Sequence, residues 1–492
     1  MTTQLTHRER KHKRVFGEFL TPRDLACRYI LPEIIPLITQ YRWVDLFAGN
    51  GNLIFPIVES VPTKDRAEFF LEHVRLYDIQ EEMVERCVQK AISLGIPEEI
   101  ARQNIKQRDT LGDYPEEIFD GPLPVYHITN PPYLYLGYIA KHRETQLYLK
   151  YFSGENEGYQ DLYQIALAND RKKGVSRMAY IIPTNFLFGA SGANKIRQDL
   201  LYDYWIRKVY VFEKSLFEHT GIHVMIAFFE RKPQPNHSPQ TFEFTKVSEN
   251  LTTSRRYTLS FSLKYRAGSD FKDFVQNFRA KIPLRASYYL MREEVEAHPG
   301  SFPLKLLDAN GYSFREGYRI LDVQVDRQLY ERIKANPLFI RTLDTGSDSG
   351  RAGLHVIPEE FGVDGIMVTT APYRTHPIQV FIDPPLSPKE LLLLKAYFNL
   401  ILEHFRKLTD SEFMTTFKYS SGTYTRKYLG LSQARALIET FPYLELPREW
   451  KEGFEFLVRA GKAEQVIDFL KRWRDEERGG KRKRLVVQGG LF

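Results

Sequence analysis

The stretch HITNPPYLYL, residues 127–136, contains residue types that could act on an aromatic amine. Pro131 and Pro132 each fix φ and remove a backbone N–H donor, so the chain is stiff at this point. The side-chain oxygen of Asn130 and the carbonyl of Pro131 could therefore form a preorganised pair of hydrogen-bond acceptors, while Tyr133 could stack on a flat ring. The alternative is a strand that ends in a proline turn, which is a common use of these residues.

Three acidic residues follow predicted strands, and the first lies beside a glycine-containing turn. In VDLFAGNGN, Gly49 and Gly51 would let the backbone approach a ligand closely, and Asp45 ends the preceding strand. Asp78 ends a second strand, where it could accept both hydroxyls of a ribose, and Asp109 ends a third, where it could accept an adenine amino group. Each aspartate could instead cap a helix. Together they predict a nucleoside pocket at the carboxyl edge of a parallel sheet.

The two features combine into one predicted reaction, because Asn130 ends a fourth strand at the same edge. An exocyclic amine is a poor nucleophile, since its lone pair is delocalised into the ring. Two acceptors on its N–H groups would favour tetrahedral geometry and stabilise the positive charge that develops. No strongly basic side chain is needed, because the methylated, charged amine is itself a strong acid. The residues therefore predict methyl transfer to an exocyclic amine.

The elements that must position these residues follow a strand–helix rhythm. Apolar runs such as WVDLF, HVRLYDI, VYHIT and RMAYIIPT alternate with helix-sized segments, which favours a mostly parallel sheet. KVYVF and HVMIAFFE are close enough in sequence to pair antiparallel at one edge. We therefore predict an α/β domain over residues 15–232, preceded by a basic arm at residues 1–14.

The proline-rich segment RKPQPNHSPQ predicts that this domain ends near residue 232. Residues 233–295 are predicted to be a linker and connecting segment, residues 296–475 a second, mixed α+β domain, and residues 476–492 a basic tail. SPKELLLLKAYFNLILEHFRKL predicts a strong helix, with Ser387 and Glu390 as a capping box.

The composition limits the class of protein. The 492 residues are too many for one ordinary domain, and a hydrophobic content of 43% supports large packed cores. The formal net charge of +7 suits a polyanionic partner. Only two cysteines, Cys27 and Cys87, are present, so neither a disulfide framework nor a cysteine-based metal site is expected. No long apolar run or secretory signal is found, so we expect a cytoplasmic protein without a membrane span or a metal.

The order and content of these motifs resemble the gamma class of DNA N6-adenine methyltransferases, which use S-adenosyl-L-methionine. In that class an [N/D/S]-P-P-[Y/F/W] element follows the glycine motif, as it does here, and the N-P-P-Y version is associated with adenine. GEFLTPRDLACRYI resembles the cofactor motif that precedes the glycine loop. DLYQIAL, YIIPTNFLF and LFEHTGIHVMIAFFER resemble later motifs. The resemblance covers about residues 14–232 and implies a Rossmann-like methyltransferase fold.

The resemblance also implies roles for individual residues. Asn130, Pro131, Pro132 and Tyr133 would form the catalytic element, and Tyr133 and Phe217 would hold the target base; a core position is the alternative for Phe217. The implied residues of the S-adenosyl-L-methionine site are Phe19, Thr21, Pro22, Asp45, Phe47, Gly49, Gly51, Asp78, Ile79, Asp109, Thr110 and Asn130.

Double-stranded DNA is the implied partner, because an adenine must leave the duplex stack to be methylated. In this class a target-recognition domain, normally C-terminal, reads the sequence, so residues 296–475 are expected to bind DNA. The segment KYSSGTYTRKY interleaves basic, aromatic and hydroxyl groups, which makes Lys418, Tyr424, Arg426 and Lys427 candidate DNA contacts. An ordinary surface loop is the alternative. A restriction–modification setting is implied, with any restriction endonuclease on another chain.

Several alternatives stay open. A methyltransferase of RNA bases, of cytosine N4 or of protein glutamine could share this fold, as could a non-catalytic DNA-binding subunit. Glutamine methyltransferases are short and lack a large distal domain, and cytosine N4 enzymes more often have Ser or Asp in place of Asn130. The pair Glu449 and Lys451 in REWKE could suggest a fused nuclease, but no Pro-Asp precedes it on a strand. FIDPPLS has Leu386 where an aromatic residue would be needed, so it predicts a turn.

Overall fold

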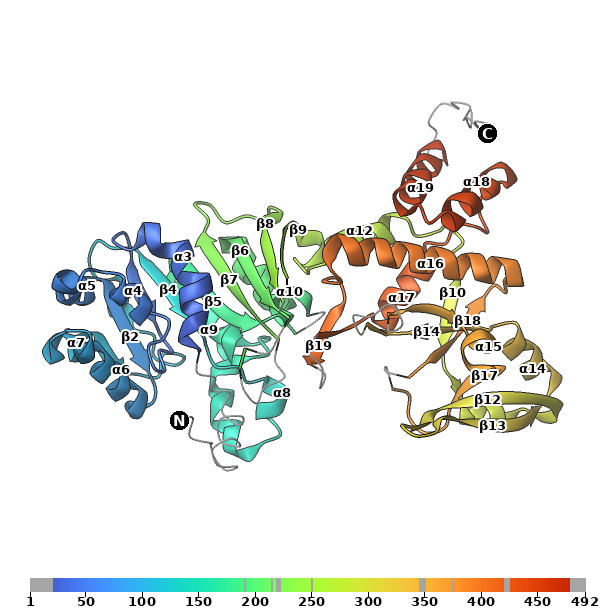
Figure 1. Cartoon of the computed structure of the whole chain (residues 1–492), viewed down its shortest axis with the longest axis horizontal. Helices are drawn as coiled ribbons and strands as arrows, with labels where there is room; N and C mark the ends of the chain where they lie inside the picture. Colours follow the sequence, from blue (N-terminus) through green and yellow to red (C-terminus); the bar gives the residue numbers. More distant parts are fainter. Residues whose placement is uncertain are drawn as a thin grey trace. The chain divides into compact units, whose positions relative to one another are not determined.

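A computed structural model describes residues 21–189, 192–213, 216–217, 223–248, 251–344, 351–373, 376–419 and 425–477. The chain divides into two compact units, which Figure 1 colours along the sequence. Unit 1 comprises residues 1–269 and 415–426, and unit 2 comprises residues 270–414 and 427–492. No helix in the described ranges is both long enough and apolar enough to cross a membrane.

Unit 1 is built on a sheet whose nine described strands run in the order β3-β2-β1-β4-β5-β7-β6-β8-β9. The first five pair in parallel, and β7 lies antiparallel between β5 and β6. This arrangement confirms the predicted α/β fold with a mostly parallel sheet at the site. The strands are β1 (Arg42–Asp45), β2 (Val74–Asp78), β3 (Ile105–Gln107), β4 (Val125–Thr129), β5 (Arg177–Pro183), β6 (Tyr204–Phe212), β7 (Val224–Arg231), β8 (Gln240–Val247) and β9 (Thr252–Leu259).

The central strands β1 and β4 are buried along their whole length, including their polar residues Arg42, Asp45, His127 and Thr129. Every residue of β1 and β4 is buried, which explains why these segments show no alternation of polar and apolar residues. The surrounding elements are α2 (Arg23–Leu25), α3 (Leu31–Ile34), α4 (Phe55–Glu59), α5 (Arg66–His73), α6 (Glu81–Ser93), α7 (Glu98–Asn104), α8 (Leu136–Ile139), the 3₁₀ segment η5 (Arg143–Phe152), α9 (Leu162–Lys173), α10 (Asn185–Phe188) and α11 (Asn194–Asp203).

The predicted boundary at residue 232 and the predicted linker at residues 233–295 are wrong. β8 pairs in parallel with β6, and β9 continues the sheet by pairing antiparallel with β8. The β6–β7 pair is antiparallel as predicted, but it is not at the edge of the sheet. The physical reason is that β6 would otherwise end the sheet with unpaired backbone groups, which the β8–β9 hairpin satisfies. The proline-rich segment is only a short connection within unit 1.

Unit 2 is a mixed α+β unit, as predicted, with two described four-stranded sheets in the orders β10-β18-β14-β16 and β11-β17-β12-β13. Its longest helix, α16 (Pro388–Thr409), begins with the predicted capping box of Ser387 and Glu390. Asp383 ends β18 just before this helix, and Glu449 and Lys451 lie on α18, which is not a strand.

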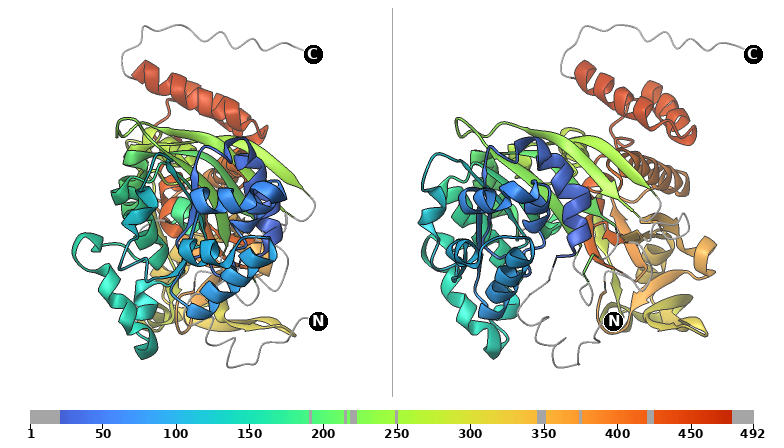
Figure 2. Two further views of the ribbon diagram at one scale, coloured as in Figure 1. Left: turned by 90° about the vertical axis from the view of Figure 1, so that its left-hand side faces the viewer. Right: turned by 60° about the vertical axis from the view of Figure 1, so that its left-hand side comes forward.

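The remaining elements of the second half are α12 (Ser269–Asn277), β10 (Arg285–Tyr288), β11 (Leu290–Met291), α13 (Arg292–Ala297), β12 (Pro299–Ser313), β13 (Gly317–Val325), α14 (Arg327–Lys334), β14 (Leu338–Arg341), β15 (Leu343–Asp344), β16 (Gly353–Val356), α15 (Ile357–Phe361), β17 (Gly365–Val368), β18 (Ile378–Asp383), β19 (Thr415–Tyr419), β20 (Thr425–Tyr428), α17 (Leu431–Ile438), α18 (Arg448–Arg459) and α19 (Ala463–Glu477). Helices α18 and α19 lie side by side, as the red segments of Figure 1 and Figure 2 show.

Candidate active site

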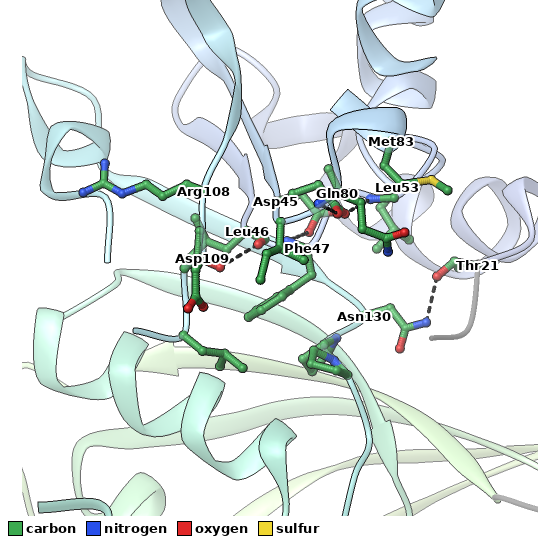
Figure 3. Close-up of a pocket in the computed structure, with 18 of the residues that line it drawn as sticks. Thr21, Asp45, Leu46, Phe47, Leu53, Gln80, Met83, Arg108, Asp109 and Asn130 are labelled. Atoms are coloured by element: carbon green, nitrogen blue, oxygen red, sulfur yellow. Dashed lines mark hydrogen bonds between the residues drawn. The ribbon is translucent and has the colours of Figure 1, made fainter. Parts of the chain in front are cut away.

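A pocket lies at the carboxyl edge of β1, β2, β3 and β4, entirely within unit 1 (Figure 3). It is lined by Thr21, residues 45–50, Asn52, Leu53, residues 78–80, Met83, residues 108–111, residues 130–132, Tyr148 and Tyr151. The strand ends that the sequence predicted to share one edge therefore do meet. In the view of Figure 3, Phe47 lies between Asp109 and Asn130.

The glycine turn after β1 needs both of its predicted glycines. Gly49 and Gly51 have φ values of +52° and +71°, which side-chain-bearing residues rarely adopt. A Cβ atom on Gly51 would also lie 2.2 Å from the Phe55 ring. Asp78 holds the turn from the end of β2, because its carboxylate accepts the N–H of Gly49 at 2.8 Å and that of Gln80 at 2.9 Å. Burial raises the pKa of Asp78, and these hydrogen bonds oppose that shift.

Asp45 lines the pocket and has one buried side-chain oxygen without a hydrogen-bond partner. Its Oδ1 accepts the Thr129 hydroxyl at 2.6 Å and the Phe47 N–H at 3.0 Å, but the buried Oδ2 has no hydrogen-bond partner. Burial raises the pKa of this carboxyl to about 7. The side-chain oxygen of Asn50, another lining residue, is likewise buried without a partner. Two residues that line the pocket therefore carry buried acceptors whose hydrogen-bonding capacity is unused.

The far end of the pocket combines a carboxylate with apolar walls. Asp109 accepts the Tyr151 hydroxyl at 2.6 Å and lies 3.3 Å from the Lys150 ammonium. Ile79 lines the pocket with 53% of its surface exposed, which leaves room for a flat ring against it. Thr110 lines the pocket, and its hydroxyl donates to the Leu46 carbonyl at 2.8 Å and so supports the turn; its role as a direct ligand contact stays a prediction.

The N-P-P-Y element forms the opposite wall. The Asn130 amide donates to the Thr21 hydroxyl at 3.0 Å, which ties this element to the segment before α2. Pro131 and Pro132 line the pocket, whereas the ring of Tyr133 is buried and does not. The Tyr133 hydroxyl bonds to the Asn130 side-chain oxygen and, at 2.7 Å, to the Ile181 carbonyl. Stacking of Tyr133 on a target base stays a prediction.

Asp161, at the start of α9, anchors the chain just after the N-P-P-Y element. Its carboxylate accepts the Leu134 N–H at 3.0 Å, and burial raises its pKa to about 7. In the segment before α2, the Thr21 carbonyl accepts a hydrogen bond from the Asn52 side-chain amide at 2.8 Å. Pro22, which directly precedes α2, has an extended backbone conformation. The predicted motifs thus support one another through hydrogen bonds between side chains and the backbone.

The other predicted site residues have different outcomes. Phe217 is buried, which agrees with the core alternative, and its role against a target base stays a prediction. Phe19, Tyr424 and the side chains of Lys418 and Arg426 lie outside the described residues. Lys427 is a correction: its ammonium is buried and bonds to Glu412 at 2.7 Å, so it is not a surface group for a DNA phosphate.

Sequence reasoning missed Tyr148 and Tyr151, which reach the pocket from η5. The aromatic-rich run LYLKYF was the available signal, but its distance from the motifs along the chain gave no reason to place it there. It also missed His127, which lies next to the motif and bonds to the glycine turn. In the ranges that the structure describes, no group of three or more His, Cys, Asp or Glu side chains is placed to hold a metal ion.

A family model described as N-6 DNA Methylase matches residues 5–259, more than half of the chain. No curated protein sequence matches significantly.

Similar solved structures include a modification subunit attributed to a type I restriction enzyme from Vibrio vulnificus YJ016, with 18% identity over 53% of this chain and 52% of that one (TM-score 0.35). A type I methyltransferase subunit from Streptococcus thermophilus shows 18% identity over 47% of this chain and 48% of that one (TM-score 0.33). The type IIG restriction endonuclease BpuSI shows 11% identity over 94% of this chain and 67% of that one (TM-score 0.42). The chain spans about half the length of the first two proteins.

Proposed function

The chain belongs to the N-6 DNA methylase family, and from this premise we propose that it transfers a methyl group from S-adenosyl-L-methionine to the N6 amine of an adenine in double-stranded DNA. The observation that carries the proposal is that Asn130 and Pro131 line the same pocket as Asp45, Asp78 and Asp109. We also propose that the methylation serves a restriction–modification system whose endonuclease is a separate chain.

The pocket residues fit the proposed cofactor group by group. The unpartnered Oδ2 of Asp45 would accept the ammonium of its amino-acid end, and Asp78 would accept its ribose hydroxyls. Asp109 would accept its adenine amine, with Ile79 and Phe47 against the ring. When bound, S-adenosyl-L-methionine supplies an electrophilic methyl group on a sulfonium. The acceptor-rich wall favours such a positively charged ligand.

Asn130 and Pro131 would act on the target amine. The hydrogen bond from the Asn130 amide to Thr21 orients the side chain, so its oxygen and the Pro131 carbonyl can accept the two N–H groups of the amine. Both acceptors would hold the amine in place while it takes the methyl group that the cofactor would supply, and the proton that the methylated amine releases would pass to water. Acceptors placed where positive charge develops lower the barrier. The base must first leave the duplex, at a cost of a few kcal/mol.

Nucleoside mass spectrometry tests the proposal directly. Unmethylated plasmid DNA is incubated with the purified full chain and S-adenosyl-L-methionine, and a reaction without the cofactor serves as the control. N6-methyladenine is the expected product. N4-methylcytosine would overturn the choice of base. If no methylated base forms although the protein binds labelled cofactor, DNA is not a sufficient substrate, and RNA, protein or a missing partner subunit would have to be tested.

A further inference from the structure

A fully buried histidine lies behind the turn that follows β1. His127 occupies the middle of β4, where its register partner in β1 is Val44. Its Nε2 accepts the backbone N–H of Leu46 at 3.1 Å, and its Nδ1 lies 2.5 Å from the Asp170 carboxylate. Leu46 is the first residue after β1, so its N–H lies beyond the ladder of that strand and needs another acceptor.

The Asp170 carboxylate determines which ring nitrogen of His127 carries the proton. Asp170 lies on α9, is fully buried, and accepts the hydroxyls of Tyr114 at 2.8 Å and Tyr180 at 2.7 Å. Burial and then the charge of Asp170 raise the pKa of both tyrosines, so both hydroxyls stay protonated donors. The carboxylate is therefore fully hydrogen bonded, and it holds the proton of the imidazole on Nδ1. Nε2 is then an acceptor that faces Leu46.

Several polar groups of the turn are hydrogen bonded to neighbouring elements. The Leu46 N–H bonds to His127, and its carbonyl accepts the Thr110 hydroxyl at 2.8 Å. One oxygen of Asp45 is occupied by Thr129 and by the N–H of Phe47. The second oxygen of Asp45 is buried without a hydrogen-bond partner, and Asp45, Leu46 and Phe47 all line the pocket.

We propose that His127 is a positioning residue, which uses the bond from Asp170 to hold residues 45–47 in the conformation that binds the cofactor. The identity of that ligand rests on the proposed function, whereas the hydrogen bond between His127 and the Leu46 N–H does not. His127 does not line the pocket itself, and in this proposal it takes no part in the methyl transfer. Its effect is on the affinity for the cofactor rather than on the rate of transfer.

Two substitutions remove the two hydrogen bonds of His127 one at a time. His127→Asn keeps an N–H at the position of Nδ1 for Asp170 but has no acceptor for Leu46. His127→Gln places an oxygen near the position of Nε2 for Leu46 but loses the donor to Asp170. Each variant loses one bond of the same buried network, so equal losses of thermal stability are expected. A purely structural role would then affect cofactor binding equally in both variants.

The readouts are equilibrium binding of radiolabelled S-adenosyl-L-methionine to the full chain and hydrogen exchange of the Leu46 amide. We expect the Kd to rise about tenfold in His127→Asn and to stay within about twofold of the wild type in His127→Gln. The KM for the cofactor should rise in the Asn variant with little change in kcat. Exchange at Leu46 should accelerate only in the Asn variant.

Equal binding by the two variants, or unchanged exchange at Leu46 in His127→Asn, would overturn the proposal. If the wild type itself binds no S-adenosyl-L-methionine, the proposed function fails, and the exchange measurement still decides the role of His127. Should the histidine variants not fold, Thr110→Val removes the other side-chain bond to Leu46 at nearly constant volume. It should weaken cofactor binding several-fold and speed exchange at residues 45–47, and no change in either would contradict the proposal.

Discussion

Asp45 is buried, so an ionised carboxylate at this position is costly. Burial raises its pKa from 3.8 to about 7. A carboxyl whose pKa is higher in the folded state binds a proton more tightly there. Its contribution to stability is therefore present in full below about pH 4 and is lost as the pH rises through about 7. Asp161, whose pKa burial also raises to about 7, contributes with the same sign.

Asp45→Asn should separate stability from binding. The amide can keep the bonds to Thr129 and Phe47 without a buried charge, so the free energy of unfolding at pH 8 should rise by about 1 kcal/mol or more. At pH 5 the gain should largely vanish, because the wild-type carboxyl is then protonated. Cofactor affinity at pH 8 should fall at least about tenfold, since the ammonium loses its counter-charge. Denaturant unfolding at both pH values and equilibrium binding measure these effects, and a gain at pH 5 as large as that at pH 8 would contradict the assignment.

Asn130 should matter for turnover far more than its neighbour Thr21. In Asn130→Ala the amine loses one of two preorganised acceptors, so kcat should fall about 100-fold or more. Thr21→Val removes the bond to the Asn130 amide but leaves the accepting oxygen, so a loss of at most about tenfold is expected. Methyl incorporation into DNA under saturating cofactor measures both. Retained DNA binding is the control, and activity of the Ala variant within a few-fold of wild type would refute the mechanism.

The 3₁₀ segment Arg143–Phe152 forms one side of the pocket, and the strand–helix pattern of the sequence did not predict this. Tyr148 and Tyr151 line the pocket from this segment, and the Tyr151 hydroxyl bonds to Asp109. Leu147, from the same segment, is 58% exposed and does not line the pocket. One side of the segment therefore lines the pocket, and the other side is exposed to solvent.

Tyr151→Phe should weaken cofactor binding about fivefold, because Asp109 loses a hydrogen bond worth about 1 kcal/mol that orders its carboxylate. Leu147→Ala is the matched control and should leave the Kd unchanged. Isothermal titration of S-adenosyl-L-methionine into each variant measures the difference. Equal affinities for the Phe variant and the wild type would show that the order of Asp109 does not depend on η5.

At the scale of the whole molecule, the excess of basic over acidic residues is expected to favour binding of the proposed DNA partner. Removing residues 478–492 takes away five basic residues and no acidic ones, which lowers the formal net charge from +7 to +2. Fluorescence anisotropy with duplex DNA should then show a slope of log Kd against log salt concentration smaller by up to about four, since each phosphate contact contributes about 0.9. Methylation of the specific site should persist at low salt. An unchanged slope would mean that these residues make no phosphate contacts.

Much of unit 1 could be predicted from local sequence. β1 and β4 are short segments that are buried along their whole length, and Gly49 and Gly51 appear where φ is positive. Parallel strands bring their carboxyl ends to one edge, so Asp45, Asp78, Asp109 and Asn130 could be placed near one another before any coordinates were known. The helix after Ser387 was equally predictable, since its cap is a local hydrogen-bond pattern.

Tertiary structure alone decided the contacts between groups that are distant in the chain. The β8–β9 hairpin extends the sheet because it pairs with the free edge of β6. The proline-rich segment before β8 gave the wrong prediction that the domain ends there. Lys427 looked like a DNA contact in the sequence, but its ammonium is buried against Glu412, a partner 15 residues away. His127 became a support for Leu46 only once Asp170 was packed against it, 43 residues later. Sequence periodicity reports which face of an element is buried, whereas the partner of a polar group depends on how the elements pack.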